Sequence, residues 1–196
     1  FDDYLLMAEF ENIQDLLNDF RDNVIREAKR NLSSGLNRKY PIQASGQLSK
    51  SLNSVVKESK NSIQISFEME EYGVYQDRGV KGKKSGRSLD NYKYTDKMPP
   101  PKAFDKWVIR KGLAPRKKGK FTGRSISSVG FRKSITFLIA RSIYSKGIKP
   151  SLFFTKPFEK FYKRLPNQLV EKYGLDMEKL FTQITNENFK RLNKWI

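Results

Sequence analysis

The chain has 196 residues, of which 37% are hydrophobic and 13% aromatic, and its formal net charge is +18. It contains no Cys and no His, which excludes disulfides and thiolate chemistry and removes the commonest general base and metal ligand. This length allows one domain, and the aromatic content favours a folded body with polar insertions over disorder. No apolar run is long enough to span a membrane, and the first ten residues carry acids without a base. We therefore expect a soluble chain without a signal peptide.

A long amphipathic helix is predicted at residues 4–32, ending at Gly35, which accepts the left-handed cap conformation. Its apolar side chains recur at alternating spacings of four and three residues, and they are Leu6, Phe10, Ile13, Leu17, Phe20 and Val24. This spacing suits packing along a second helix, in the same chain or in a neighbouring copy. We assign these six residues to an oligomer interface.

Short elements are predicted between residues 41 and 79. Ser45 can cap a helical turn that places Leu48 and Leu52 on one face. Apolar and polar residues then alternate, as in a half-buried strand. The expected elements are a helical turn at 45–52, antiparallel strands at 53–58 and 62–69 joined by a turn at Lys60-Asn61, and one or two helical turns at 72–79.

The second half of the chain is predicted to be mainly helical, interrupted by loops at 80–98 and 113–124 that lack apolar periodicity and are expected to be mobile. A helix at 129–146 is apolar on most sides, so we expect it at the centre of the fold. Phe104 and Trp107 lie at helical spacing and are expected in the core. The other expected elements are a helix at 103–111, an extended segment at 150–154, and helices at 156–172 and 176–193, separated by a break at Gly174.

The positive charge is concentrated in residues 78–124, which hold 16 bases and three acids, a net charge of +13, whereas residues 1–35 carry −4. Two runs of bases with Gly suggest exposed loops that contact a polyanion, either nucleic acid or an acidic protein surface. For a single run, a solvated loop without a specific partner is the simpler reading. The residues expected to make this contact are Lys81, Lys83, Lys84, Arg87, Arg116, Lys117, Lys118, Lys120 and Arg124.

Aromatic residues within this basic segment have two readings. Tyr92, Tyr94 and Phe121 either stack on unpaired bases beside phosphate-binding lysines or attach the loops to the body. The sequence does not distinguish the two.

No catalytic, cofactor-binding or metal-binding motif is present. Glu68, Glu70, Glu71 and Asp77 lie close in sequence, but no second carboxylate cluster is available to complete a metal site. We therefore favour a solvent-facing strand end whose acids pair with Lys and Arg. A carboxylate-dependent nuclease needs two converging acids and remains a third hypothesis, after the structural and nucleic-acid-binding readings.

Three segments together resemble a known family. Residues 45–52 read Ser-Gly-Gln-Leu-Ser-Lys-Ser-Leu, residues 72–80 Tyr-Gly-Val-Tyr-Gln-Asp-Arg-Gly-Val, and residues 149–154 Lys-Pro-Ser-Leu-Phe-Phe. In this order they resemble the T-G-x-L-x-x-S-I, Y-A-x-Y-x-x-x-G-T and x-P-x-x-F-(L/F) patterns of neck proteins of tailed bacteriophages, the head–tail connector and tail-completion family. Gly73 replaces the Ala of that pattern, and Val80 the Thr. Residues 107–112 and 137–143 are similar to an insertion in longer members.

The resemblance implies an α+β fold with a small antiparallel sheet packed against helices. We expect a single domain over 1–196, with a helix at 1–35, a connector-like core at 45–160 that carries mobile basic loops at 80–101 and 113–128, and a helical extension at 161–196. It also implies a homo-oligomeric ring in the virion neck, assembled in the host cytoplasm, without cofactor, catalysis or membrane. The implied partners are the portal or adaptor, the tail proteins and, as a further candidate, the packaged DNA. The alternative is a basic nucleic-acid-binding accessory protein.

Overall fold

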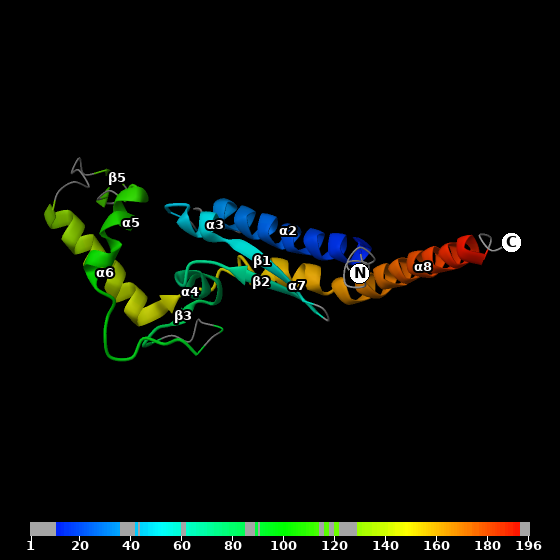
Figure 1. Cartoon of the computed structure of the whole chain (residues 1–196). Helices are drawn as coiled ribbons and strands as arrows, with labels where there is room; N and C mark the ends of the chain where they lie inside the picture. The colour runs from blue at the N-terminus through cyan, green and yellow to red at the C-terminus, as the bar shows by residue number, and fades with distance from the viewer. Residues whose placement is uncertain are drawn as a thin grey trace. The chain divides into compact units, whose positions relative to one another are not determined.

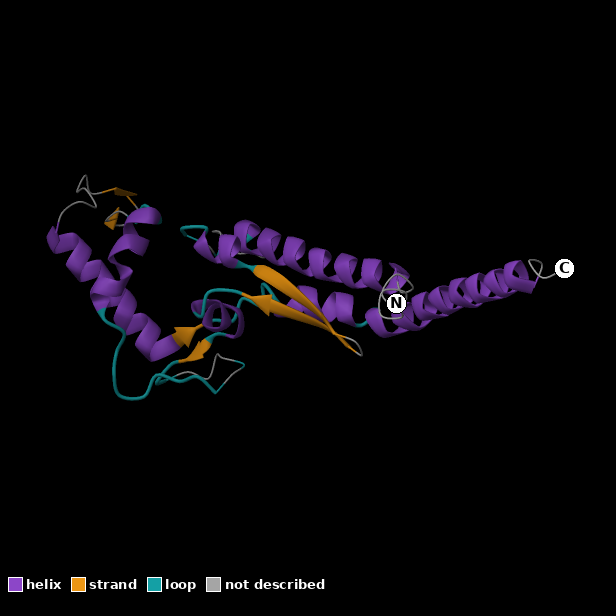
Figure 2. Cartoon of the chain, in the orientation of Figure 1, coloured by secondary structure: helices purple, strands orange, loops and turns teal. Residues whose placement is uncertain are grey.

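The computed structural model describes residues 11–35, 42, 44–59, 62–84, 89, 91–113, 116–117, 120–121 and 129–192, with side-chain burial for all of these except 58–59, 116–117, 120–121 and 187–192. The fold is α+β, with helices and short antiparallel strand pairs (Figures 1 and 2). The chain divides into two compact units, one formed by residues 1–27 and 156–196 and the other by residues 28–155. The expectation from sequence is a single domain, divided internally near residues 35 and 160.

The helices of the first unit are the N-terminal part of α2 (Glu11–Ser34), most of α7 (Thr155–Tyr162) and α8 (Leu165–Leu192). Phe20 and Val24 of α2 are buried. The Phe20 ring meets the Phe158 ring of α7 edge to face, with 5.8 Å between the ring centres. The apolar stripe predicted on this helix is therefore used inside the chain at these two positions.

This packing corrects part of the predicted oligomer interface. Phe20 and Val24 are unavailable to a neighbouring copy, because their own chain already covers them. Ile13 and Leu17 are half-buried. Leu6 and Phe10 lie outside the described residues.

The carboxylate of Asp176 caps the beginning of α2. It accepts hydrogen bonds from the Asn12 amide at 3.2 Å, the Ile13 amide at 3.1 Å and the Asn12 side chain at 2.6 Å. These backbone amides are among those that an α-helix leaves without an internal partner at its N-terminus. Asp176 itself is buried and lies within α8.

The break predicted at Gly174 is wrong, because α8 runs through this residue without interruption. A glycine inside a helix costs only about 1 kcal/mol relative to alanine, which the rest of a 28-residue helix tolerates. The interruption lies earlier, at the turn of Lys163 and Arg164 between α7 and α8. Pro166 then occupies the first turn of α8, where a missing amide hydrogen has no cost.

The second unit contains shorter elements. Its helices are α3 (Gln47–Ser51), α4 (Tyr72–Arg78), the 3₁₀ helix η1 (Pro101–Phe104), α5 (Asp105–Arg110) and α6 (Val129–Lys146). Its strands are β1 (Asn53–Ser59), β2 (Ser62–Glu68), β3 (Val80–Lys81), β4 (Arg116–Lys117), β5 (Lys120–Phe121) and β6 (Gly147–Ile148). The pairs β1–β2, β3–β6 and β4–β5 are antiparallel.

The core of this unit gathers Ala28, Leu32, Leu48, Leu52 and Phe153. Leu48 and Leu52 therefore share a buried face, as their spacing predicted. The Ser45 hydroxyl accepts a hydrogen bond from the Gln47 amide at 3.4 Å, although Gly46 is the residue at the cap position.

The predicted strand pair is confirmed as the β1–β2 hairpin, in which Val56 lies opposite Ile65. Phe67 of β2 packs edge to face on Phe154, with ring centres 5.3 Å apart. The predicted turn at Lys60-Asn61 lies outside the described residues. The helix ends predicted at Gly35 and Gly79 are also confirmed, with φ angles of 78° and 81°.

The expectation that the helix at 129–146 is central is wrong. In α6, Thr136 and Ala140 are buried on the side that packs against η1 and α5. Phe137 and Leu138 are exposed, Leu138 at 56%. The sequence is apolar around most of this helix, but in the described part of the unit only one face of it is covered.

Candidate functional site

Lys81 of the basic segment lies on β3, which pairs with β6 directly after α6 (Figure 2). Gly82 and Gly147 make this close approach possible. A Cβ atom on Gly82 would lie 2.3 Å from the Gly147 nitrogen, and one on Gly147 would lie 2.0 Å from the Val80 oxygen. Gly147 also has a φ of 76°, which favours glycine. Neither position has room for a side chain.

Backbone hydrogen bonds hold the next two lysines at the C-terminal end of α6. The Lys83 amide donates to the Tyr144 carbonyl at 2.8 Å, and the Lys84 amide donates to the Ser145 carbonyl at 2.9 Å. These carbonyls belong to the last turn of an 18-residue helix, whose dipole places partial negative charge there. Both lysine side chains are exposed. The Lys83 ammonium group lies over the Tyr144 ring, 5.8 Å from its centre.

A second strip of the basic segment runs beside the first. The Lys81 amide donates to the Tyr92 carbonyl at 2.8 Å, the Tyr94 amide donates to the Lys81 carbonyl at 3.0 Å, and Lys81 and Lys93 form a parallel bridge. Lys93 is exposed and Lys81 is half-buried. We call Lys81, Lys83, Lys84 and Lys93 the basic platform. Among the described residues none of these four lysines forms a salt bridge.

Tyrosine rings attach this segment to the helices. Tyr92 packs on Tyr75 of α4 with ring centres 4.7 Å apart, and Tyr94 packs on Tyr144 of α6 at 6.3 Å. The Tyr144 hydroxyl also donates to the Thr95 carbonyl at 2.9 Å. Burial raises the pKa of the Tyr94 phenol.

These contacts favour the attachment reading for Tyr92 and Tyr94. In the described residues of 80–98, hydrogen bonds and ring contacts join the segment to α4 and α6. Residues 94–98 form neither helix nor strand, as predicted for a loop. The structure describes only the backbone of Phe121, so neither reading is tested for this residue.

The second basic run is described only in its backbone. Arg116 and Lys117 form β4 and Lys120 belongs to β5, a two-residue hairpin where a loop was predicted. Their side chains are not described, and Arg87, Lys118 and Arg124 lie outside the described residues. Of the predicted polyanion-contacting residues, the structure therefore brings together Lys81, Lys83 and Lys84.

Asp77 is buried and caps α7, which corrects the expectation of a solvent-facing acid. Its Oδ1 atom accepts hydrogen bonds from the Phe154 amide at 2.8 Å and the Thr155 amide at 3.3 Å. Its Oδ2 atom accepts a hydrogen bond from the Thr155 hydroxyl. Both carboxylate oxygens are thus occupied by structural contacts.

The neighbouring acids do not converge on Asp77. Glu68, Glu70 and Glu71 are exposed, as predicted. The described residues contain no group of three or more acids that could hold a metal ion.

The three segments that carry the family resemblance pack on one another. Hydrogen bonds join residues 72–80 to residues 149–154. The backbone carbonyl of Gln76 accepts them from the Ser151 amide at 3.2 Å and the Ser151 hydroxyl at 2.6 Å. Gly73 packs so closely on the first segment that a Cβ atom there would lie 2.9 Å from Cδ1 of Leu48. The same Cβ atom would lie 2.5 Å from Sδ of Met69, so a larger residue at position 73 requires these flexible side chains to move. The segments form one structural unit within residues 28–155.

A pocket of about 290 Å³ opens beside two of these segments. Trp107 and Arg110 of α5 contribute to its lining together with Tyr72 of α4, and burial, followed by the nearby Glu70 carboxylate, raises the pKa of Tyr72. Trp107 is exposed, so its assignment to the core is wrong. Helical spacing alone could not reveal this, because it does not show which helix face is covered.

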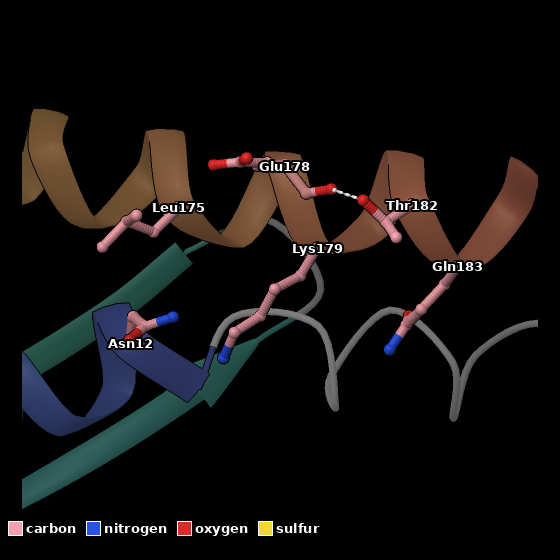
Figure 3. Close-up of a pocket in the computed structure, with 6 residues that line it drawn as sticks. All are labelled: Asn12, Leu175, Glu178, Lys179, Thr182 and Gln183. Atoms are coloured by element: carbon pink, nitrogen blue, oxygen red, sulfur yellow. Dashed lines mark hydrogen bonds between the residues drawn. The ribbon is translucent and has the colours of Figure 1, made fainter.

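The first unit has an open groove of about 410 Å³ along α8, shown in Figure 3. It is lined by Asn12, Leu175, Glu178, Lys179, Thr182 and Gln183. Lys179 lies 3.9 Å from the Glu11 carboxylate, and the Thr182 hydroxyl donates to the Glu178 carbonyl. These groups offer salt bridges and hydrogen bonds, but no assembled nucleophile and base.

Comparison of the chain with protein-family models, with curated proteins and with solved structures gave no match in any of the three. Within the part of the chain that the structure describes, we find no helix with the length and apolar character needed to cross a lipid bilayer.

Proposed function

We propose that this chain is a structural virion protein that forms a homo-oligomeric ring in the neck of a tailed phage. In this role it joins the portal or adaptor to the tail around the DNA channel, as a connector or tail-completion component, and performs no catalysis. The observation that carries the proposal is the mutual packing of the three segments that resemble the neck-protein patterns. Segments that match in order and also meet in space are better explained by a shared architecture than by three chance matches.

Exposed apolar side chains support a role as one protomer of an assembly. On α8, Val170, Tyr173, Phe181 and Ile184 are exposed, Val170 at 75% and Phe181 at 63%. Their spacing of three, eight and three residues places them along one side of the helix. Apolar stripes of this kind on a folded chain mark surfaces that another protein covers.

The charge of the chain fits the proposed position. A protein that surrounds packaged DNA or contacts an acidic portal or adaptor benefits from exposed positive charge, because complementary potentials guide assembly. The lysines of the basic platform supply this positive charge, and backbone hydrogen bonds hold Lys83 and Lys84 at the end of α6.

Electron microscopy and mass photometry of the purified chain test this proposal. We expect closed rings of a single stoichiometry, whose population increases with protein concentration. A chain that remains monomeric at every concentration, and that is also missing from the necks of virions of its phage, would show the proposal to be wrong.

A second candidate is a nucleic-acid-binding accessory protein. It is favoured by the exposed lysines of the basic platform, which among the described residues have no acidic partner. This candidate requires DNA binding by the isolated chain, with an affinity that falls steeply as salt increases.

A further inference from the structure

The chain carries an acidic surface as well as a basic one. Residues 1–22 contain seven acids and one Arg, a net charge of −6, in a chain of net charge +18. In the described part of this segment, Asp15, Asp19 and Asp22 of α2 are exposed. Their spacing of four and three residues places them on one side of the helix. We call these three residues the acidic face.

Two of the three acids have no described partner. Asp22 forms a salt bridge with Arg21 at 2.8 Å, and the Arg21 hydrogen bond lowers the pKa of the Asp22 carboxyl. Among the described residues, Asp15 and Asp19 form no salt bridge. The acidic face therefore offers unneutralised carboxylates, and the basic platform offers unneutralised ammonium groups.

A homo-oligomer of this chain must overcome the mutual repulsion of copies that each carry +18. Contact between two basic regions would increase this repulsion. Contact between the acidic face and the basic platform would instead replace it with attraction. Among the described surfaces, this pairing places unlike charges against each other and so opposes the repulsion between copies.

We propose that the basic platform of one copy binds the acidic face of α2 in a second copy. The two surfaces differ, so the contact is head to tail and leaves one unused surface of each kind on the resulting pair. Such heterologous contacts produce rings when the rotation between copies closes. The inference rests on the proposed ring and names the surfaces that join its protomers.

Neutral variants of exposed residues test this contact. Lys83→Gln with Lys84→Gln weakens the platform, and Asp15→Asn with Asp19→Asn weakens the acidic face. We expect each pair to weaken self-association at least about tenfold, as loss of complementary charges across an interface does. Lys156→Gln with Lys163→Gln is the matched control, because it removes the same charge from exposed positions outside both surfaces and should leave assembly unchanged.

Mixing the two variants gives a sharper readout. The platform variant keeps an intact acidic face, and the acidic-face variant keeps an intact platform. A head-to-tail contact therefore predicts a 1:1 complex that does not grow further, detected by analytical ultracentrifugation. A chain that carries Lys83→Asp, Lys84→Asp, Asp15→Lys and Asp19→Lys together should recover assembly, because the two charges have exchanged places.

The outcomes separate this inference from the proposed function. If the platform variant forms wild-type rings but loses affinity for labelled duplex DNA, the platform is a DNA-binding surface and the inference is wrong, while the ring stands. If the wild type forms only open chains or pairs that require both surfaces, the inference holds and the neck-ring function fails. Circular dichroism of each variant must match the wild type, because only a folded variant reports on the contact.

Discussion

Asp77 and Asp176 show how single buried carboxylates connect distant parts of this chain. Asp77 caps α7, whose first residue lies 78 positions away, and Asp176 caps the start of α2 from 164 positions away. In both cases the carboxylate accepts hydrogen bonds from backbone amides at a helix N-terminus. The helix dipole adds a favourable interaction with the negative charge.

Replacing Asp77 tests this role at the scale of one residue. Asp77→Ala leaves the Phe154 and Thr155 amides without their acceptor, so we expect the free energy of unfolding to fall by about 2 kcal/mol. Asp77→Asn keeps one carbonyl oxygen for these amides and can donate to the Thr155 hydroxyl, so its loss should be less than about 1 kcal/mol. Urea denaturation measures both values. Equal losses in the two variants would show that charge, and not hydrogen-bond geometry, is the main contribution.

At the scale of elements, α6 and α8 are two long helices that leave apolar surface exposed. The apolar residues of α6 surround the helix, and among the described residues η1 and α5 cover one side of it. Four exposed apolar residues of α8, Val170, Tyr173, Phe181 and Ile184, lie along one side, as in a helix that packs on a partner. Both patterns are visible in the sequence, but the identity of the covering surface is not.

Substitutions on α8 test whether its apolar stripe contributes to assembly. Phe181 and Ile184 are exposed, so Phe181→Ser with Ile184→Ser should leave the fold intact but reduce ring formation, because apolar area is no longer buried between copies. Asn186 is exposed on the opposite side of α8 from Ile184. Asn186→Ser is therefore the control and should assemble normally. Light scattering at matched concentrations reports the difference. Normal assembly of the double variant would exclude the stripe from the interface.

At the scale of the whole molecule, the separation of charge along the chain is its main electrostatic property. Residues 1–35 are acidic and residues 78–124 strongly basic. The acidic face and the basic platform place part of this charge on described, exposed surfaces of the two units. The same surfaces are available to a DNA channel, an acidic protein or a second copy, and these partners differ in their response to salt.

The salt dependence of DNA binding distinguishes the nucleic-acid-binding candidate from a ring component. If DNA is the partner, affinity at about 50 mM salt should be high and should fall linearly on a log–log scale as salt increases, with a slope set by the number of phosphates neutralised. Lys83→Gln with Lys84→Gln should then reduce this slope. Fluorescence anisotropy measures both effects. Absence of binding at low salt would remove this candidate.

Sequence by itself determined the features that depend on nearby residues. The spacing of apolar residues identified α2, the shared face of Leu48 and Leu52, and the β1–β2 hairpin, because side-chain direction repeats with the backbone period. Glycine predicted the helix ends at Gly35 and Gly79, since a left-handed conformation is a local property. The mainly helical α+β class follows from the same local patterns.

Tertiary structure alone decided which residues meet across long separations. The capping by Asp77 and Asp176, the pairing of β3 with β6 and the attachment of the basic segment by Tyr92 and Tyr94 all join residues far apart in the chain. Composition predicted a loop at 80–98, because bases and glycines lack apolar periodicity. The contacts of this loop with α6 depend on carbonyls at the end of that helix and on the space left by Gly82 and Gly147, which local sequence does not encode.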